Sequence, residues 1–144
     1  MVVLEDRISE WESKGEILDG YFNPAGVFDN ITVVGLVEDQ PKVETVARLC
    51  APALPRYVNA GINRRRLMLA SFGLRQGRLR SLLARLSDYA VSDPPDVLRA
   101  YGDGLAAVAA AIIGRAAGIP YAVSIHTTSD PQIQSRYLGA RDRL

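Results

Sequence analysis

The sequence predicts an α/β domain built on a parallel sheet, and two segments carry that prediction. Residues 96–125 follow the pattern strand, helix, strand, which is typical of a βαβ unit with two parallel strands. Residues 31–37 are almost continuously apolar and β-branched, as in a parallel strand that is covered on both faces. We therefore expect a Rossmann-like, three-layer domain with helices on both faces of its sheet.

The first sixty residues contain weaker signals. Apolar residues recur at helical spacing over residues 5–18, which predicts a helix that ends before Gly20. Residues 42–50 fit either a short helix or an extended edge segment. The prolines and glycine between Pro52 and Gly61 predict a loop.

The second half of the chain shows clearer periodicity. Two helical stretches are expected between residues 64 and 89, and the second carries an apolar stripe at i, i+3, i+4 and i+7, formed by Leu79, Leu82, Leu83 and Leu86. A short strand is expected at residues 96–100. The next helix begins after Asp103 as its N-cap and ends at Gly118, and a strand follows at residues 121–125.

Length and composition set the scale of the protein. A chain of 144 residues, 48% of them hydrophobic, fits one domain over residues 1–144 and is too short for two. No segment is long and apolar enough to predict a membrane span, and the acidic start does not resemble a secretory signal, so we expect a cytoplasmic protein. With Cys50 and His126 as the single cysteine and histidine, no metal site is expected, and Cys50 is interpreted as a packing residue.

The net charge of +1 conceals an uneven distribution. Residues 1–44 contain ten acidic and three basic side chains, whereas residues 45–87 contain nine arginines and no acidic residue. Such a basic block indicates either an anionic partner, such as a membrane surface, or an ordinary solvated face. Nucleic acid is not expected as the partner, because few aromatic residues are interleaved with the arginines. The surface arginines that we single out are Arg64, Arg65, Arg66, Arg78 and Arg85.

Candidate site residues follow the last two predicted strands. Ligands of open parallel sheets bind beyond the carboxyl ends of the strands, where this sequence places Arg99, Tyr101, His126 and Asp130. Each has a structural alternative: His126 can be a packed residue, Arg99 can pair with a neighbouring aspartate, and Asp130 can simply start a turn. Neither a G-x-G-x-x-G loop nor a Walker A sequence is present, so no dinucleotide cofactor and no ATP hydrolysis are expected.

Several segments form an ordered set of motifs along the chain. Near the amino terminus these are Lys14-Gly15-Glu16-Ile17, then Tyr21-Phe22-Asn23-Pro24, and Phe28-Asp29 before a strand. The second half contains Pro95-Asp96-Val97-Leu98-Arg99-Ala100-Tyr101-Gly102 and the run from Gly118-Ile119-Pro120 to His126. In this order the segments resemble family 4 glycosyltransferases, and the resemblance covers nearly all of residues 12–130.

The resemblance implies one half of a GT-B fold, the acceptor-side domain of a retaining enzyme. Such enzymes move a sugar from a nucleotide-sugar donor to an acceptor, often a glycan or a lipid-linked molecule at the cytoplasmic leaflet. In the family the histidine after the last strand lies near the transferred sugar, a role that falls on His126. The arginine of the preceding strand lines the cleft, a role that falls on Arg99. The basic surface would then contact the membrane peripherally.

The sequence departs from this family in two places. Only Met1 to Leu4 remain for the first strand, which we expect to be missing or vestigial, and no donor-binding domain follows Leu144. We therefore expect the chain to be inefficient without a donor-domain partner, because transfer needs both proximity and stabilisation of the departing diphosphate. The alternative prediction is a non-catalytic Rossmann-like module that uses its arginines to bind a membrane or a partner.

Overall fold

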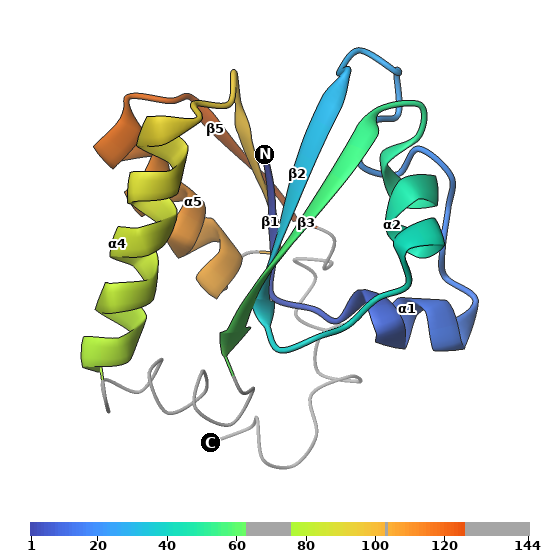
Figure 1. Ribbon diagram of the computed structural model, residues 1–144, viewed down its shortest axis with the longest axis horizontal. Helices are drawn as coiled ribbons and strands as arrows, with labels where there is room; N and C mark the ends of the chain where they lie inside the picture. The colour runs from blue at the N-terminus through green and yellow to red at the C-terminus, as the bar shows by residue number, and fades with distance from the viewer. Residues whose placement is uncertain (63–75, 103, 126–144) are drawn as a thin grey trace, which may run out of the picture.

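The sheet is the centre of the protein in a computed structural model that describes residues 1–62, 76–102 and 104–125. Its five strands are all parallel and lie in the order β3-β2-β1-β4-β5. Their bounds are β1 Val2–Leu4, β2 Asn30–Val37, β3 Leu54–Ile62, β4 Leu98–Tyr101 and β5 Tyr121–Ser124. The expected Rossmann-like α/β class is confirmed, with the carboxyl ends of the strands at the bottom of Figure 1.

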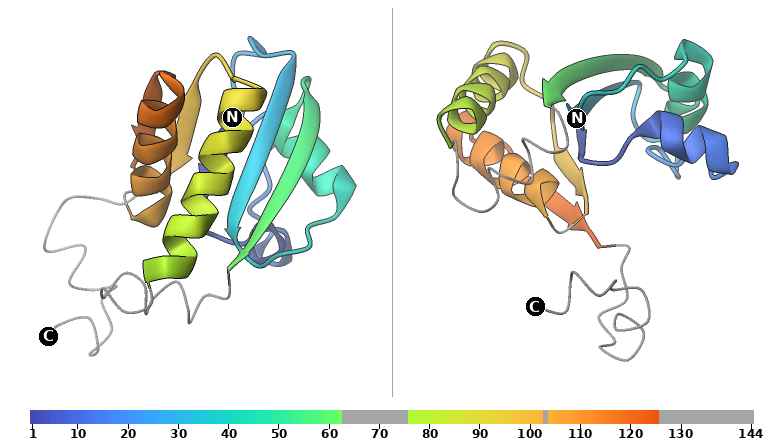
Figure 2. Two further views of the ribbon diagram at one scale, coloured as in Figure 1. Left: turned by 60° about the vertical axis from the view of Figure 1, so that its left-hand side comes forward. Right: turned by 90° about the horizontal axis from the view of Figure 1, so that it is seen from below.

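Helices cover both faces of this sheet, which gives three layers (Figure 2). The helices α1 (Ile8–Lys14) and α2 (Val43–Cys50) follow β1 and β2 and lie on one face. The helices α4 (Gln76–Ser92) and α5 (Leu105–Ala117) lie on the other face, and α5 connects β4 to β5. The chain therefore changes face between β3 and β4, and strand order reverses at β1.

The hydrophobic core on the α4/α5 face consists of aliphatic side chains, and the one buried hydroxyl described on α4, that of Ser87, donates to the Leu83 carbonyl of the same helix. Small residues of α5 allow that helix to lie close to the sheet, and Gly114 has no room for a Cβ because the Ile119 carbonyl oxygen would lie 2.8 Å from it. Leu82, Leu83 and Leu86 of the predicted α4 stripe are buried here, as their helical spacing predicts. The largest members of this core are Val3, Val34, Leu36, Leu82, Leu83, Leu86, Leu98, Ile113 and Ile119.

The α1/α2 face is richer in aromatic and polar groups. Phe22 and Tyr101 pack with ring centroids 5.0 Å apart, and Trp11 and Tyr21 extend the cluster. Cys50 is fully buried among them, which confirms its interpretation as a packing residue. Burial raises the pKa of its thiol to about 11.

One expectation about the first sixty residues is wrong, and one open alternative is decided. The segment predicted as a loop, Pro52 to Gly61, belongs mostly to the nine-residue strand β3, which extends to Ile62. Its proline is tolerated because β3 is the edge strand of the sheet, where one row of backbone groups needs no partner strand. Residues 42–50, for which helix and extended edge were both open, form α2 from Val43 to Cys50.

Helix α1 is shorter than predicted. It ends at Lys14 because Gly15 takes the left-handed conformation, with φ of 73°, and its N–H donates to the Glu12 carbonyl. The expected N-cap of α5, Asp103, lies outside the described residues, as does the first helical stretch predicted after residue 64. Val2–Leu4, for which we expected a missing or vestigial strand, forms the three-residue β1 at the centre of the sheet.

Candidate functional site

The carboxyl edge of the sheet between β1 and β4 is the candidate site that the topology defines. The chain leaves β1 toward α1 on one face and leaves β4 toward α5 on the other, so the two connections diverge. Ligands of open α/β sheets bind where such connections diverge. The described residues at this edge include Glu5 and Arg7 after β1, Asp39 after β2, and Gly102 after β4.

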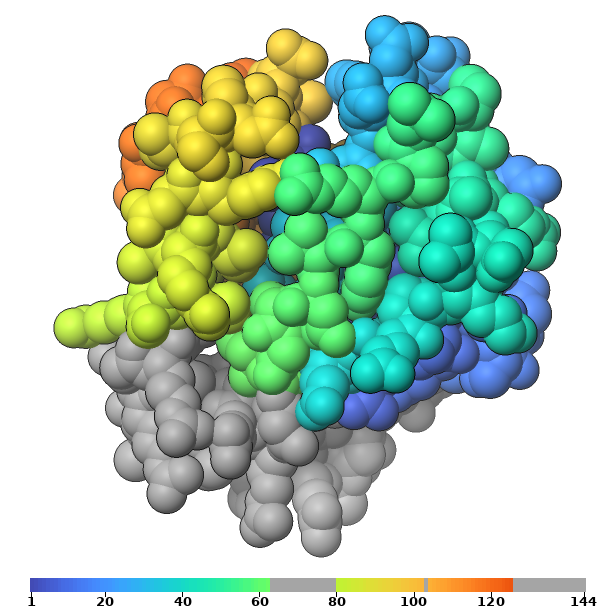
Figure 3. All heavy atoms as spheres, viewed as in Figure 1, coloured from blue at the N-terminus to red at the C-terminus, as the bar shows by residue number. Residues whose placement is uncertain are grey.

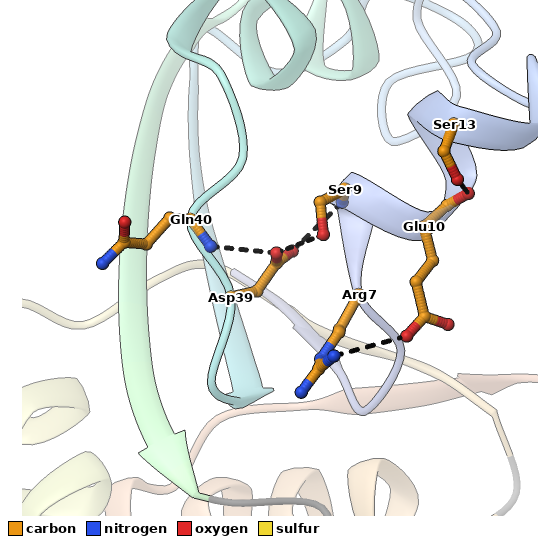
Figure 4. Close-up of polar contacts among 6 residues, drawn as sticks. All are labelled: Arg7, Ser9, Glu10, Ser13, Asp39 and Gln40. Atoms are coloured by element: carbon orange, nitrogen blue, oxygen red, sulfur yellow. Dashed lines mark hydrogen bonds and ion pairs between the residues drawn. The ribbon is translucent and has the colours of Figure 1, made fainter.

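The start of α1 is held by a carboxylate from the neighbouring strand connection (Figure 4). Asp39 accepts hydrogen bonds from the Ser9 backbone N–H at 3.2 Å and from the Ser9 hydroxyl. The Gln40 N–H donates to the same carboxylate at 2.9 Å. Asp39 is only 7% exposed, so these hydrogen bonds are largely shielded from water. It occupies the end of α1 where an anion would otherwise be attracted.

A second carboxylate fills the start of α5. The backbone N–H groups of Leu105 and Ala106 donate to Glu5 Oε2 at 2.7 Å and 3.2 Å. Gly104 lets the carboxylate approach this closely, because a Cβ at that position would lie 2.7 Å from Glu5 Oε1. Glu5 follows β1 and therefore ties β1 to α5 across the site. At both helices beside the divergence point, backbone N–H groups of the first turn thus donate to a carboxylate of this chain.

Arg99 is oriented by two neighbours on the α1/α2 face of β4. Its Nε donates to Ser124 Oγ at 2.8 Å, and its guanidinium carbon lies 4.7 Å from the centroid of the Tyr101 ring. Within the described ranges no carboxylate lies within ion-pair distance of Arg99, so the expected alternative of pairing with Asp96 is not found there. The arginine is half-buried and positioned to present its remaining N–H groups to an anion or a hydroxyl.

Tyr101 has a positioning role in this arrangement. It is buried, and its hydroxyl donates to the Tyr21 carbonyl at 3.1 Å, which connects β4 to the loop before β2. Burial raises the pKa of Tyr101 to about 12, so its hydroxyl keeps its proton at neutral pH. Tyr101 therefore supports Arg99 and the loop and is not itself open to a ligand.

The other predicted site residues are only partly placed. His126 and Asp130 lie outside the described residues, as do Arg64, Arg65 and Arg66, and nothing is described of the side chain of Arg78. Arg85 is exposed on α4, together with Arg80. Two further arginines of the basic block contact acidic residues: Arg48 is 2.7 Å from Asp19, and Arg56 is 3.7 Å from Asp93. Part of the charge asymmetry in the sequence is thus neutralised in the fold.

Two buried polar atoms near the carboxyl edge have no hydrogen-bond partner among the described residues. They are Arg7 Nε and the hydroxyl of Tyr57. Burial and the nearby Asp39 carboxylate raise the pKa of Tyr57 to about 12. The tyrosine ring occupies the space beside Gly35, where a Cβ would lie too close to the hydroxyl. The sequence analysis singled out neither Arg7 nor Tyr57. It also missed Glu5 and Asp39, because their hydrogen bonds join segments distant in the chain.

Two hollows lie at the opposite, amino edge of the strands. One, of about 190 Å³, is polar and includes Asp93 and Asp96. Figure 3 shows the notch in which it lies, at the top of the molecule between the start of β2 and the approach to β4. The other, of about 240 Å³, is mainly apolar and extends across the α1/α2 face to Arg99 and Ala122.

Among the residues that the structure describes, no group of three histidine, cysteine or acidic side chains is arranged to hold a metal ion. None of the described helices is both long and apolar enough to cross a membrane.

The fold and this edge define a Rossmann-like α/β domain with a ligand-side edge between β1 and β4. Comparison with protein-family models, with curated proteins and with solved structures gives no match for the chain. Only the sequence segments quoted above therefore support a particular family.

Proposed function

We propose that this chain is the acceptor-side domain of a retaining glycosyltransferase. It would act with a donor-binding domain to move a sugar from a nucleotide-sugar donor to a glycan or lipid-linked acceptor. The proposal starts from the quoted segments that resemble family 4 glycosyltransferases. Two of them, residues 95–102 and 118–126, include the neighbouring strands β4 and β5, which end at the candidate site.

The observation that carries the proposal is the occupation of the two helix starts at the site. A nucleoside diphosphate bound by a single Rossmann-like domain would use the amides at such a helix N-terminus. Here the amides of α5 are bound to Glu5 and the start of α1 is bound to Asp39. A diphosphate would have to displace a carboxylate and would be repelled by it. This favours the acceptor side of a two-domain cleft over the donor side.

The residues divide by role in this proposal. His126 lies near the transferred sugar, as the resemblance implies, and Asp130 accepts a hydrogen bond from a hydroxyl of the acceptor. Arg99 donates to an oxygen of the acceptor, and Ser124 and Tyr101 hold its guanidinium in place. Tyr101 acts as a positioning residue because its own hydroxyl is bound to Tyr21.

Two-dimensional NMR of the isolated chain tests which side of the cleft it forms. We expect oligosaccharide or lipid-linked acceptors to shift the amides of Gly102 and Ser124, and nucleoside diphosphates to leave those of Leu105 and Ala106 unshifted. Saturable binding of a nucleoside diphosphate at Leu105 and Ala106 would overturn the assignment to the acceptor side.

A transfer assay then tests the chemistry. The chain is mixed with a candidate donor domain, a panel of nucleotide sugars and the acceptor identified by NMR, and the product is followed by mass spectrometry. His126→Ala should reduce transfer by about a hundredfold or more, the scale at which loss of one group that stabilises the transition state lowers kcat. The matched control is Arg115→Ala at the exposed end of α5. Undiminished transfer by His126→Ala would remove His126 from the mechanism.

A second candidate function is peripheral binding to an anionic membrane face, and one observation favours it. Arg80 and Arg85 are exposed on α4, while Leu82, Leu83 and Leu86 of the same helix are buried in the core. Such a surface binds by charge alone, because the apolar stripe that would insert into the lipid is already covered.

Co-sedimentation with vesicles tests this second function. Vesicles of phosphatidylserine and phosphatidylcholine should retain the chain at low salt and release it at high salt. The double variant Arg80→Gln, Arg85→Gln should be retained less, and Arg115→Gln should behave like the unmodified chain. Absence of retention at low salt would exclude membrane binding by this surface.

A further inference from the structure

The apolar hollow on the α1/α2 face is lined by side chains of the sheet as well as by a loop. Its apolar walls come from β1, β2, β5 and the loop before β2, in the side chains Val2, Phe22, Phe28, Ile31 and Ala122. Its volume of about 240 Å³ is somewhat below the range of pockets that hold drug-sized ligands. It therefore suits a small molecule or a short apolar chain.

Buried polar contacts hold the walls in place. Asn23 is 2% exposed, and its side-chain amide both donates to the Phe28 carbonyl at 2.9 Å and accepts from the Phe28 N–H at 3.2 Å. These two bonds close the loop and place Phe28 at the hollow. The bond from Tyr101 to the Tyr21 carbonyl ties the other end of the loop to β4. The hollow is thus pre-formed, and a ligand would not have to order it.

One end of the hollow is cationic. Arg99 lines it and lies in register with Val2 on one side and Ala122 on the other. Its described contacts are a hydroxyl and an aromatic ring, neither of which neutralises its charge. A half-buried guanidinium beside apolar walls gains more from an anion than an exposed one does, because water screens it less.

The opposite end of the hollow carries charges of both signs. It shares Met1, Phe28, Asn30 and Val97 with the neighbouring polar hollow, which contains the acidic side chains of Asp93 and Asp96. The Met1 ammonium donates to the Val97 carbonyl at 2.8 Å and interacts electrostatically with Asp96, and Asp93 is 3.7 Å from Arg56. The charges at that end are therefore paired, whereas no described carboxylate lies within ion-pair distance of Arg99, so Arg99 is the favoured position for an anionic head.

We propose that this hollow binds a small anionic amphiphile, a medium-chain alkyl carboxylate, with its carboxylate on Arg99 and its chain against Val2, Phe22 and Ile31. The apolar walls give no partners to an inorganic anion, and the arginine disfavours a cationic head. The inference concerns binding alone and stands whether or not the chain takes part in sugar transfer.

Three probes of equal chain length separate charge from apolar contact. Octanoate, octanol and octylammonium are titrated into the chain below their aggregation concentrations, and binding is followed by calorimetry and by the amide signals of Ala122 and Ser124. We expect saturable binding of octanoate at least tenfold tighter than of octanol, and weaker binding of octylammonium than of either. Equal affinity for octanoate and octanol would overturn the proposal.

Two variants locate the site. Arg99→Met keeps an unbranched side chain without charge and should weaken octanoate at least tenfold while leaving octanol unchanged. Ala122→Leu fills the hollow from an exposed position and should weaken both probes. Arg115→Met, at the exposed end of α5, is the matched control and should change neither. If Arg99→Met fails to fold, Ala122→Leu and the three probes still test whether the hollow binds octanoate. Octanoate binding that is unaffected by Ala122→Leu would overturn the proposal.

Discussion

The two faces of the sheet differ in chemistry although the same strands form both. The α4/α5 face is a core of aliphatic side chains and alanines, with Leu98 and Ile113 at its centre. The α1/α2 face combines aromatic rings, a thiol, two tyrosine hydroxyls and the buried carboxylate of Asp39. Arg99 and the apolar hollow lie on this second face as well.

This difference indicates which face is committed to stability and which to recognition. A mainly aliphatic face contributes by burial and packing, and the buried Ser87 hydroxyl of α4 is already bonded within its own helix. The mixed face carries polar groups that must be satisfied one by one, and each of them fixes a loop or a helix start. Glu5 joins the two faces, since it leaves β1 and binds the start of α5.

The largest effect is expected on the aliphatic face. Leu98→Ala removes a fully buried side chain from β4 and should lower the free energy of unfolding by about 3 kcal/mol, through lost burial and the cavity left behind. Urea denaturation measures the change, and Val91→Ala, at a position 58% exposed, should cost well under about 1 kcal/mol. Equal losses at the two positions would contradict the packing of β4 against α5.

The next effect is expected at the carboxylate of the mixed face. Asp39→Ala leaves the Ser9 hydroxyl and two backbone N–H groups without their acceptor and should cost about 2 kcal/mol. Asp29→Ala, an exposed aspartate just before β2, is the matched control and should be nearly neutral. Thermal unfolding of both variants gives the comparison, and a neutral Asp39→Ala would show that water replaces the carboxylate.

A smaller effect is expected where the two faces meet. Glu5→Ala removes a half-buried cap from α5 and should cost about 1 kcal/mol, in the usual range for the loss of a helix cap. Amide hydrogen exchange should accelerate at Leu105 and Ala106 before it does so elsewhere in α5. Glu5→Gln keeps an acceptor oxygen and should lose less. Unchanged exchange at these two amides in Glu5→Ala would contradict the contact.

Alkaline pH should lower the stability of the protein through three groups of the α1/α2 face. Burial raises the pKa of Cys50 to about 11 from its ordinary 9.0, and those of Tyr57 and Tyr101 to about 12 from 10.0. Between these values the unfolded chain releases protons that the folded chain retains, so stability is full below pH 9 and falls as pH rises toward 12.

The substitution Tyr57→Phe tests how much of this loss of stability comes from Tyr57. Tyr57→Phe removes a hydroxyl that has no partner among the described residues and should change stability at pH 7 by less than about 0.5 kcal/mol. Denaturant midpoints measured from pH 7 to 11 should then fall less steeply above pH 10 than those of the unmodified chain. An identical decline would mean that Tyr57 does not keep its proton through burial.

The sequence predicts the elements whose signals are local and misses those set by distant partners. The buried run at residues 31–37, the leucine stripe of α4 and the glycine at the end of α5 are all readable from spacing alone. The strand β3 was missed because its proline reads as a loop signal unless the strand is known to lie at the edge. The residue at the N-cap position of α5, Gly104, makes no side-chain cap, and Glu5 takes that place from a hundred residues away in the sequence.

The candidate site divides in the same way. Strand-end reasoning found Arg99 and Tyr101, and the structure brings both together with Ser124. The same reasoning could not predict that Asp39 and Glu5 accept hydrogen bonds from the starts of α1 and α5. Each contact joins segments that follow two different strands and come together only in the folded sheet. The roles proposed for His126 and Asp130 stay predictions, since both residues lie outside the described part of the chain.

The short strand β1 also has a consequence for the order of folding. Its three residues pair with β2 about thirty residues away and with β4 almost a hundred residues away. The two outer pairs, β2 with β3 and β4 with β5, join segments closer in the chain and can form first, because closing a shorter loop costs less entropy. The sheet becomes continuous only when β1 enters between them, so we expect insertion of this first strand to be a late step of folding.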